Sequence, residues 1–328
     1  MWLSPSLILM LISILTSVLL VFSSPSLLIS WVGLELNTLV FLPLMLMKKY
    51  KMSSEASIKY FLTQTLASIL IVIGALSFFL NIPLLGNGLV LLGLAIKLGV
   101  APFHSWVLSV AEGLGWGVLF ILLTIQKINP LIMMHMFIEN FFELTYFLIM
   151  LTLVVGGLMG LIHTSPRLLL TFSSINHMGW MLTGFMYNFG VGVSYFIVYS
   201  IVLLPVMMVF SMFNISHINE LFLINFPKPN LLMLFLPLLS LGGLPPFLGF
   251  LPKWVVLQFV LGGGYYLLSL VMILASLFTL FFYLRMMFSA FIMSGVKLTL
   301  LKHVTSLSTL NLSLLGLSLL GLPLYLLI

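Results

Sequence analysis

Cysteine and aspartate are absent from this sequence, and only 5% of its 328 residues are charged. Without cysteine the chain can form no disulfide, no cysteine-ligated iron–sulfur cluster and no zinc–thiolate site. It also contains no glycine-rich phosphate loop after a strand pattern, and no two of its six histidines are four residues apart. We therefore expect neither redox chemistry nor nucleotide hydrolysis from this chain, and no bound metal or cofactor.

The scarcity of charge also excludes a water-soluble surface, which needs roughly a quarter of charged residues. Hydrophobic residues make up 62% of the chain, and many apolar runs reach the ~20 residues that a membrane-spanning helix needs. The sequence therefore predicts an all-α polytopic membrane protein. A net charge of +6 would suggest nucleic acid as a partner of a soluble protein, but here it marks one side of a membrane, so we expect no nucleic acid.

The apolar runs predict about eleven spanning helices within a single membrane domain, residues 1–328. The first run has no basic start and no small-residue cleavage site, so we interpret it as a helix and not as a signal peptide. The expected helices lie near residues 3–22, 27–47, 58–80, 88–107, 117–137, 144–162, 168–186, 191–212, 230–260, 265–289 and 307–327.

The charges between these helices divide between the two sides of the membrane. One side receives Glu139 and Glu143 and no lysine or arginine. The positive-inside rule therefore places the N-terminus and the basic loops inside and the C-terminus outside. The basic residues of the inner side are Lys48, Lys49, Lys51, Lys59, Arg167, Lys228, Arg285, Lys297 and Lys302.

Four charged residues lie well inside the expected helices, away from the helix ends: Glu35, Lys97, Lys127 and Lys253. Each costs about 2.5–3.5 kcal/mol at the centre of a spanning helix, so such residues usually have a function. The alternative is an ion pair that only joins two helices. Proton transfer is the chemistry that a buried lysine supports, because burial favours its neutral form and a nearby carboxylate restores its charged form.

The fourth and ninth helices share the pattern Gly-x-x-Pro-Phe, at residues 99–103 and 243–247. Proline removes a main-chain donor, so each helix is expected to be discontinuous there, with a hydrated site at the break. The two patterns lie five helices apart, which is an odd number, so the two segments run in opposite directions. Matching broken helices predict an inverted repeat, with one half over about 27–137, the other over about 144–289, and a separate C-terminal helix at 307–327.

Two histidines are candidates for passing a proton, because histidine titrates near neutral pH. His104 follows Lys97 by about two helical turns, or roughly 10 Å along the axis. His177 lies within the seventh expected helix. The alternative for His104 is a residue at a helix end that is hydrogen-bonded to a carbonyl group. Pro130 follows Lys127 by three residues and predicts a bend beside that lysine.

Several long motifs resemble the mitochondrial NADH dehydrogenase subunit 2 family, the antiporter-like membrane subunits of respiratory complex I. They are W-V-G-L-E-L-N, E-A-S-I-K-Y-F-L-T-Q-T-L-A-S, K-L-G-V-A-P-F-H-S-W-V, Q-K-I-N-P, S-S-I-N-H-M-G-W-M-L and L-S-L-G-G-L-P-P-F-L-G-F-L-P-K-W. These motifs follow one another from about residue 31 to residue 254, whereas the rest of the chain adds only apolar helices.

The resemblance implies a proton-translocating core subunit of NADH:ubiquinone oxidoreductase in the mitochondrial inner membrane, with the N-terminus on the matrix side and the C-terminus on the intermembrane-space side. It implies that Glu35 pairs with Lys97, and that Lys127, Lys253, His104 and His177 carry protons. NADH, FMN, the iron–sulfur clusters and ubiquinone would be used by the whole complex. The implied partners are subunits 4, 4L and 6, accessory subunits, and phospholipids that include cardiolipin.

Two other functions remain open at this stage. The inverted repeat also permits a cation/proton antiporter that works alone or in a cation-exchange complex. Alternatively, the polar residues are relicts and the subunit only joins its neighbours.

Overall fold

The computed structural model describes residues 5–47, 51–223 and 228–292, which form helices and short connections without a strand. The chain divides into two compact units, residues 1–149 and 150–328. The first unit contains α1 (Pro5–Ser23), α2 (Leu27–Leu46), α3 (Lys51–Phe79), α4 (Pro83–Leu98), α5 (Ser105–Gly113), α6 (Trp116–Leu123), α7 (Ile125–Ile138) and a short 3₁₀ turn, η1 (Glu139–Phe141).

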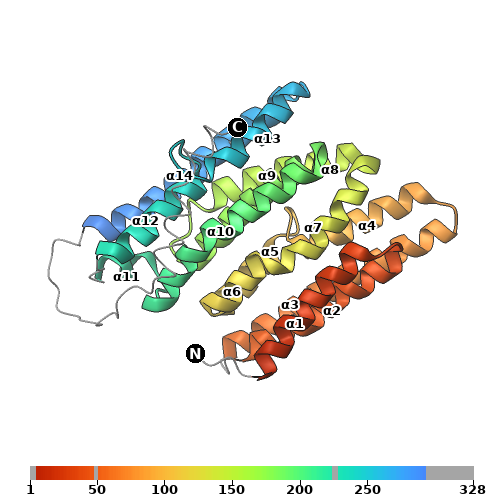
Figure 1. Cartoon of the computed structure of the whole chain (residues 1–328), viewed down its shortest axis with the longest axis horizontal. Helices are drawn as coiled ribbons and strands as arrows, with labels where there is room; N and C mark the ends of the chain where they lie inside the picture. Colours follow the sequence, from red (N-terminus) through yellow and green to blue (C-terminus); the bar gives the residue numbers. More distant parts are fainter. Residues whose placement is uncertain (1–4, 48–50, 224–227, 293–328) are drawn as a thin grey trace. The chain divides into compact units, whose positions relative to one another are not determined.

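In the first unit, the broken helix that consists of α4 and α5 packs against α3. Both α4 and α5 lie along α3 (Figure 1). Glycines permit the close approach of α4, because a Cβ atom at Gly93 would lie 2.8 Å from the carbonyl oxygen of Ala67. Small residues at helix interfaces serve this purpose in membrane proteins. α7 packs against α1, α2 and α4, so charged residues of α2, α4 and α7 can meet inside this unit.

The second unit contains α9 (Pro166–Tyr187), α10 (Phe189–Phe213), α11 (Ile218–Leu223), α12 (Lys228–Gly242), α13 (Phe250–Gly262) and α14 (Tyr266–Ile292), and α8 (Phe142–Met159) crosses the boundary between the units. α9 is buried along almost its whole length and packs against α10, α13 and α14. Arg285 of α14 donates hydrogen bonds to the carbonyls of Gly160, Leu161 and His163, and so ties α14 to the connection that follows α8.

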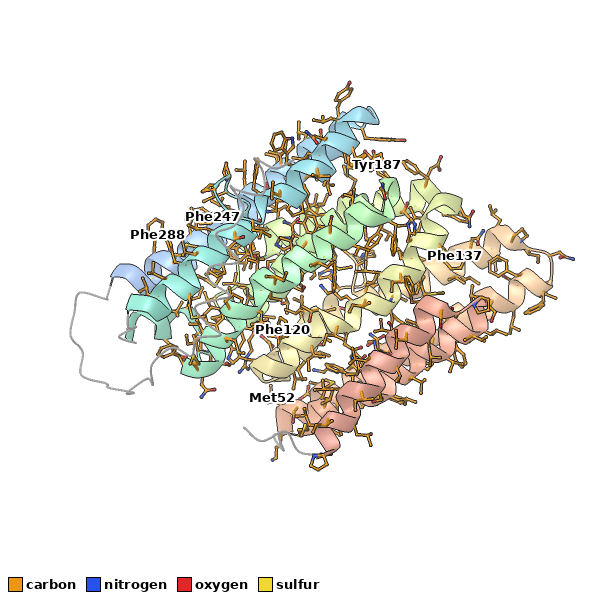
Figure 2. All side chains as sticks on the ribbon, in the orientation of Figure 1. Met52, Phe120, Phe137, Tyr187, Phe247 and Phe288 are labelled. Carbon is orange, nitrogen blue, oxygen red and sulfur yellow. The ribbon has the colours of Figure 1, made fainter. Side chains whose placement is uncertain are left out.

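The helices expose apolar surface of the kind that lipid covers. Figure 2 shows carbon atoms dominating the side chains along the helices. Large apolar side chains such as Leu9 and Phe22 are 68% and 69% exposed. Seven helical segments in the described part of the chain are long and apolar enough to cross a membrane. They are Pro5–Ser23, Leu27–Leu46, Lys51–Phe79, Trp116–Ile138, Phe142–Met159, Phe189–Phe213 and Tyr266–Ser289.

The remaining predicted spans differ from these seven in informative ways. The fourth and ninth are interrupted, which leaves the shorter helices α4, α5, α12 and α13. The seventh corresponds to α9, whose buried polar residues lower its hydropathy. The C-terminal helix at 307–327, with Lys297 and Lys302 before it, lies outside the described residues.

Candidate functional site

Glu35 and Lys97 form an ion pair in the first unit, in which the lysine is buried and the glutamate is partly exposed. The Lys97 Nζ lies 3.0 Å from the Glu35 Oε1, and the side chains are 2% and 22% exposed, respectively. Thr38, one turn after Glu35, donates a hydrogen bond to the main-chain oxygen of Glu35 at 2.8 Å and lies 3.4 Å from its Oε2. A charge pair removed from water is stable only when both charges are well paired. The predicted proximity of Glu35 and Lys97 is therefore confirmed.

The α4 helix ends one residue after Lys97. Gly99 adopts a left-handed conformation with φ of 70°, and a Cβ atom there would lie 2.2 Å from the Val107 Cγ2, so glycine is required at this position. The break frees main-chain carbonyls at the end of α4. The indole Nε1 of Trp106 donates to the Ile96 carbonyl at 2.9 Å, in addition to the bond that this carbonyl accepts from the Gly99 N–H at 3.1 Å. Trp106 is only 8% exposed and caps the broken helix from within.

His104 lies in the turn between α4 and α5, where its Nδ1 is 3.2 Å from the Pro102 carbonyl oxygen. The expected helical spacing from Lys97 to His104 is wrong, because residues 99–104 do not continue the helix. This position corresponds to the alternative of a helix-end histidine bonded to a carbonyl group.

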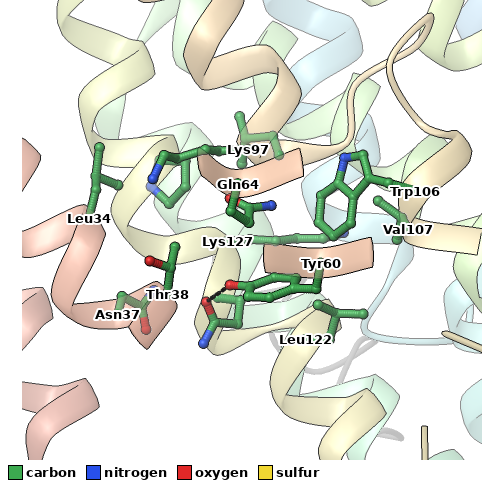
Figure 3. A pocket seen from close by; sticks show the side chains of 13 residues that line it. Leu34, Asn37, Thr38, Tyr60, Gln64, Lys97, Trp106, Val107, Leu122 and Lys127 are labelled. Carbon is green, nitrogen blue, oxygen red and sulfur yellow. Dashed lines mark hydrogen bonds between the residues drawn. The ribbon is translucent and has the colours of Figure 1, made fainter. Parts of the chain in front are cut away.

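Lys127 lies in α7 and faces the same cavity as Lys97 (Figure 3). The Tyr60 hydroxyl donates to the Gln126 Oε1 at 3.2 Å beside this cavity. The interruption near Lys127 lies at Thr124, three residues before it, where the φ and ψ angles are −119° and −82°. Pro130, where the sequence predicts a bend, lies within α7. The structure therefore brings Glu35, Lys97 and Lys127 together at one polar site, whereas His104 remains in its turn.

Lys253 lies at the break of the second broken helix, in the other unit. Its Nζ donates to the carbonyls of Leu241 and Gly242 at 2.9 and 3.0 Å, and these are the last carbonyls of α12. A cation is favourable at a helix C-terminus because the carbonyl dipoles point toward it. Gly243 has φ of 82°, and a Cβ atom there would lie 2.8 Å from the Lys253 Cδ. A cavity of about 350 Å³ opens beside this lysine.

His177 is buried in α9, among aromatic residues. Its Nδ1 lies 2.8 Å from the Tyr195 hydroxyl, and the rings of Tyr195 and Tyr199 lie 5.9 and 5.0 Å from its own. Trp180, one turn after His177, stacks on Tyr195 and places its ring 5.7 Å from the Lys253 Nζ. The aromatic residues thus connect His177 with Lys253 inside the second unit.

Four residues that the sequence analysis did not select belong to these sites: Tyr60, Gln126, Tyr195 and Trp180. For Tyr60 and Tyr195, the sequence signal was the spacing of polar residues within apolar helices. Tyr60 and Gln64 are four residues apart, as are Tyr195 and Tyr199, which places each pair on one helix face. For metal binding, the described residues include no group of three histidine or glutamate side chains that could hold an ion.

Comparison with known proteins matches this arrangement to one family. The family described as NADH:quinone oxidoreductase/Mrp antiporter, transmembrane, matches residues 24–279. The NADH-ubiquinone oxidoreductase chain 2 of Anopheles gambiae is 43% identical over 297 residues, which cover 88% of this chain and 86% of the relative. The corresponding protein of Mus musculus is 37% identical over 281 residues, which cover 81% of each chain.

Solved structures show the same fold. A chain of respiratory complex I from Thermus thermophilus superimposes with a TM-score of 0.80 at 25% identity, covering 95% of this chain and 77% of that chain. A chain of the Mrp complex from Dietzia sp. shares the fold, with a TM-score of 0.76 at 20% identity and coverage of 86% and 59%. The chain therefore belongs to the NADH-ubiquinone oxidoreductase chain 2 family, within the NADH:quinone oxidoreductase/Mrp antiporter membrane proteins.

Proposed function

We propose that this chain is a proton-translocating, antiporter-like core subunit of NADH:ubiquinone oxidoreductase (complex I) in the mitochondrial inner membrane. The observation that carries the proposal is the Glu35–Lys97 ion pair, at 3.0 Å and with the lysine buried, beside the cavity that Lys97 shares with Lys127. A lysine whose counter-charge is a single carboxylate changes its preferred protonation state when that carboxylate moves or is neutralised. Such a pair can couple a change elsewhere in the complex to the movement of a proton.

In this proposal the chain moves protons and carries no redox centre. Electron transfer from NADH through FMN and iron–sulfur clusters to ubiquinone takes place in other subunits of the complex. The absence of cysteine from the sequence supports this division, because iron–sulfur clusters are held by cysteine thiolates. Moving one charge across 100 mV costs about 2.3 kcal/mol, so the driving force must come from the rest of the complex.

Six residues are assigned to proton transfer: Glu35, Lys97, Lys127, Lys253, His104 and His177. In the first unit, Glu35 sets the charge of Lys97, and Lys127 exchanges protons across the shared cavity. In the second unit, His177 and Lys253 lie on either side of the Trp180–Tyr195 stack. His104 has the weakest support, because its imidazole lies at the Pro102 carbonyl in the turn.

The topology and the partners are part of the same proposal. We assign eleven membrane helices in two inverted repeats, over about 27–137 and 144–289, followed by a C-terminal helix. Two breaks of the same Gly-x-x-Pro-Phe type, one in each compact unit, support this assignment. The asymmetry of the basic loops supports an N-terminus in the matrix and a C-terminus in the intermembrane space. Subunits 4, 4L and 6, accessory subunits and phospholipids such as cardiolipin are the proposed partners.

The test is a Lys97→Met variant in the assembled complex, reconstituted into liposomes. We expect NADH oxidation coupled to proton uptake to fall strongly, because the proton-carrying amine is lost. Lys59→Met is the matched control, since Lys59 forms only an exposed pair with Glu55 on α3. Wild-type pumping by Lys97→Met in a normally assembled complex would contradict the proposal and favour a subunit that only joins its neighbours. Cation exchange without an electron donor would indicate an independent antiporter.

A further inference from the structure

Lys97 and Lys127 line one small cavity in the first unit. Its volume of about 20 Å³ is close to what one water molecule needs. Polar side chains from α2, α3 and α7 line it together with the two lysines (Figure 3). They are Asn37, Thr38, Tyr60, Gln64 and Gln126.

Two amide groups of this lining are buried with an unused hydrogen-bonding atom. Asn37 and Gln126 are 2% and 8% exposed. The Asn37 Oδ1 and the Gln126 Nε2 have no hydrogen-bond partner among the described residues. One atom is an acceptor and the other a donor, so a single water can accept from Gln126 and donate to Asn37. Buried polar atoms are normally satisfied in this way, because an unmade hydrogen bond is costly in a low-dielectric interior.

Tyr60 determines which way the Gln126 amide turns. Its hydroxyl donates to the Gln126 Oε1 at 3.2 Å, so the oxygen is occupied and the Nε2 remains for another acceptor. The Tyr60 ring is itself held edge-on by Phe41 and Trp106, at centroid distances of 5.2 and 5.8 Å. The orientation of the amide is therefore built into the packing of α3 against its neighbours.

We propose that Asn37 and Gln126 hold one ordered water between Lys97 and Lys127, and that Tyr60 positions Gln126 to do so. This inference rests on the proposed function, because a bound water matters to activity only if protons pass between the two lysines. Asn37, Gln126 and Tyr60 are then positioning residues, which act through the water and carry no proton themselves.

The first test is a density map of the intact complex at a resolution that shows ordered water. We expect a peak within hydrogen-bond distance of both the Asn37 and the Gln126 amide groups. The peak disappears in Asn37→Leu, which removes the acceptor, and persists in Asn37→Asp, which keeps it. A wild-type cavity without a peak overturns the proposal.

The second test measures proton pumping per NADH oxidised. We expect Asn37→Leu and Gln126→Leu to slow proton uptake about tenfold or more, since positioned proton transfer contributes at least that much. Tyr60→Phe removes one hydroxyl and is expected to slow proton uptake less than the leucine variants do. Asn37→Asp is expected to pump faster than Asn37→Leu. If both leucine variants pump at the wild-type rate while Lys97→Met does not, the water site is wrong and the proposed function stands. If Lys97→Met also pumps normally, the proposed function itself fails.

Discussion

Lys253 in α13 donates a hydrogen bond to the Leu241 carbonyl in α12, across the break between the two helices, at 2.9 Å. Lys97 is paired differently, because its amine meets the Glu35 carboxylate and Trp106 caps the carbonyl end of its helix. Each broken helix therefore has a lysine beside it. The partner of Lys97 is a charged carboxylate, whereas the partners of Lys253 are main-chain carbonyls. We expect the two lysines to respond differently when their partners are changed.

Removing the Glu35 charge is expected to leave the Lys97 amine buried without its counter-charge. Breaking a fully buried pair on one side typically costs about 3–5 kcal/mol, and the partial exposure of Glu35 lowers the cost for this pair. Glu35→Gln therefore lowers the thermal stability of the assembled complex and its coupled activity. Glu35→Gln combined with Lys97→Met recovers part of the stability but not the proton pumping. The control is Glu55→Gln, which changes only an exposed pair; equal losses in both variants would contradict this account.

Gly243→Ala is expected to destabilise the second break. The residue has φ of 82°, and the added methyl group would press on the Lys253 side chain. Strain of this kind costs about 1–3 kcal/mol, which a thermal melt of the complex can detect. Gly262→Ala in α13 is the matched control, because no atom lies within 4 Å of the added carbon. Similar melting temperatures for both variants would show that the left-handed turn is not strained by a side chain.

Trp106→Phe keeps the ring and removes the donor to the Ile96 carbonyl. Because the Ile96 carbonyl keeps its bond from the Gly99 N–H, losing the indole bond is expected to cost about 0.5–1.5 kcal/mol and to loosen the end of α4 beside Lys97. Faster amide exchange at residues 95–100 would show the loosening. Trp31→Phe is the comparison, since the Trp31 Nε1 has no hydrogen-bond partner among the described residues. Equal amide exchange in the two variants would show that Trp106 does not hold the end of α4.

Tyr195→Phe removes the hydroxyl that lies 2.8 Å from the His177 Nδ1. The hydrogen bond at one ring nitrogen determines which tautomer a histidine adopts. We therefore expect the pH profile of proton uptake to shift while the amount of assembled complex stays constant. Ser200→Ala on the exposed face of α10 serves as the control. An unchanged profile in Tyr195→Phe would mean that this hydroxyl does not orient a working histidine.

Glu220 provides a pH dependence outside the membrane helices, in α11. Burial raises the pKa of this carboxyl, but hydrogen bonds from the Ser216 side chain and main chain and from His217 outweigh it, so the pKa is lowered. A lowered folded-state pKa stabilises the fold above the ordinary carboxyl pKa and loses that effect as pH falls through the folded value. The protection factors of the amides near Ser216 should therefore fall in acid, and Glu220→Gln should abolish that fall. A wild-type acid response in Glu220→Gln would contradict this assignment.

Several features of the fold could be predicted from residues alone because their causes are local. Proline cannot donate to the preceding turn, and glycine at 99 and 243 adopts the left-handed conformation, so both helix breaks follow from a five-residue pattern. The interruption near Lys127 lies at Thr124, six residues before Pro130, and no neighbouring proline or glycine marks it in the sequence. His104 could not be placed either, since helical spacing does not apply across a break.

Composition and apolar run length were enough to establish a helical membrane protein, because lipid demands that every main-chain group be satisfied within the helix. They also showed that charges within spanning helices are costly, and so marked four residues as candidates for function: Glu35, Lys97, Lys127 and Lys253. Only the tertiary structure decided the partner of each one. Lys97 meets a carboxylate 62 residues earlier in the chain, and Lys253 meets two carbonyls across a break. Such pairing depends on how each helix is rotated against its neighbours, and that rotation is determined by packing between helices.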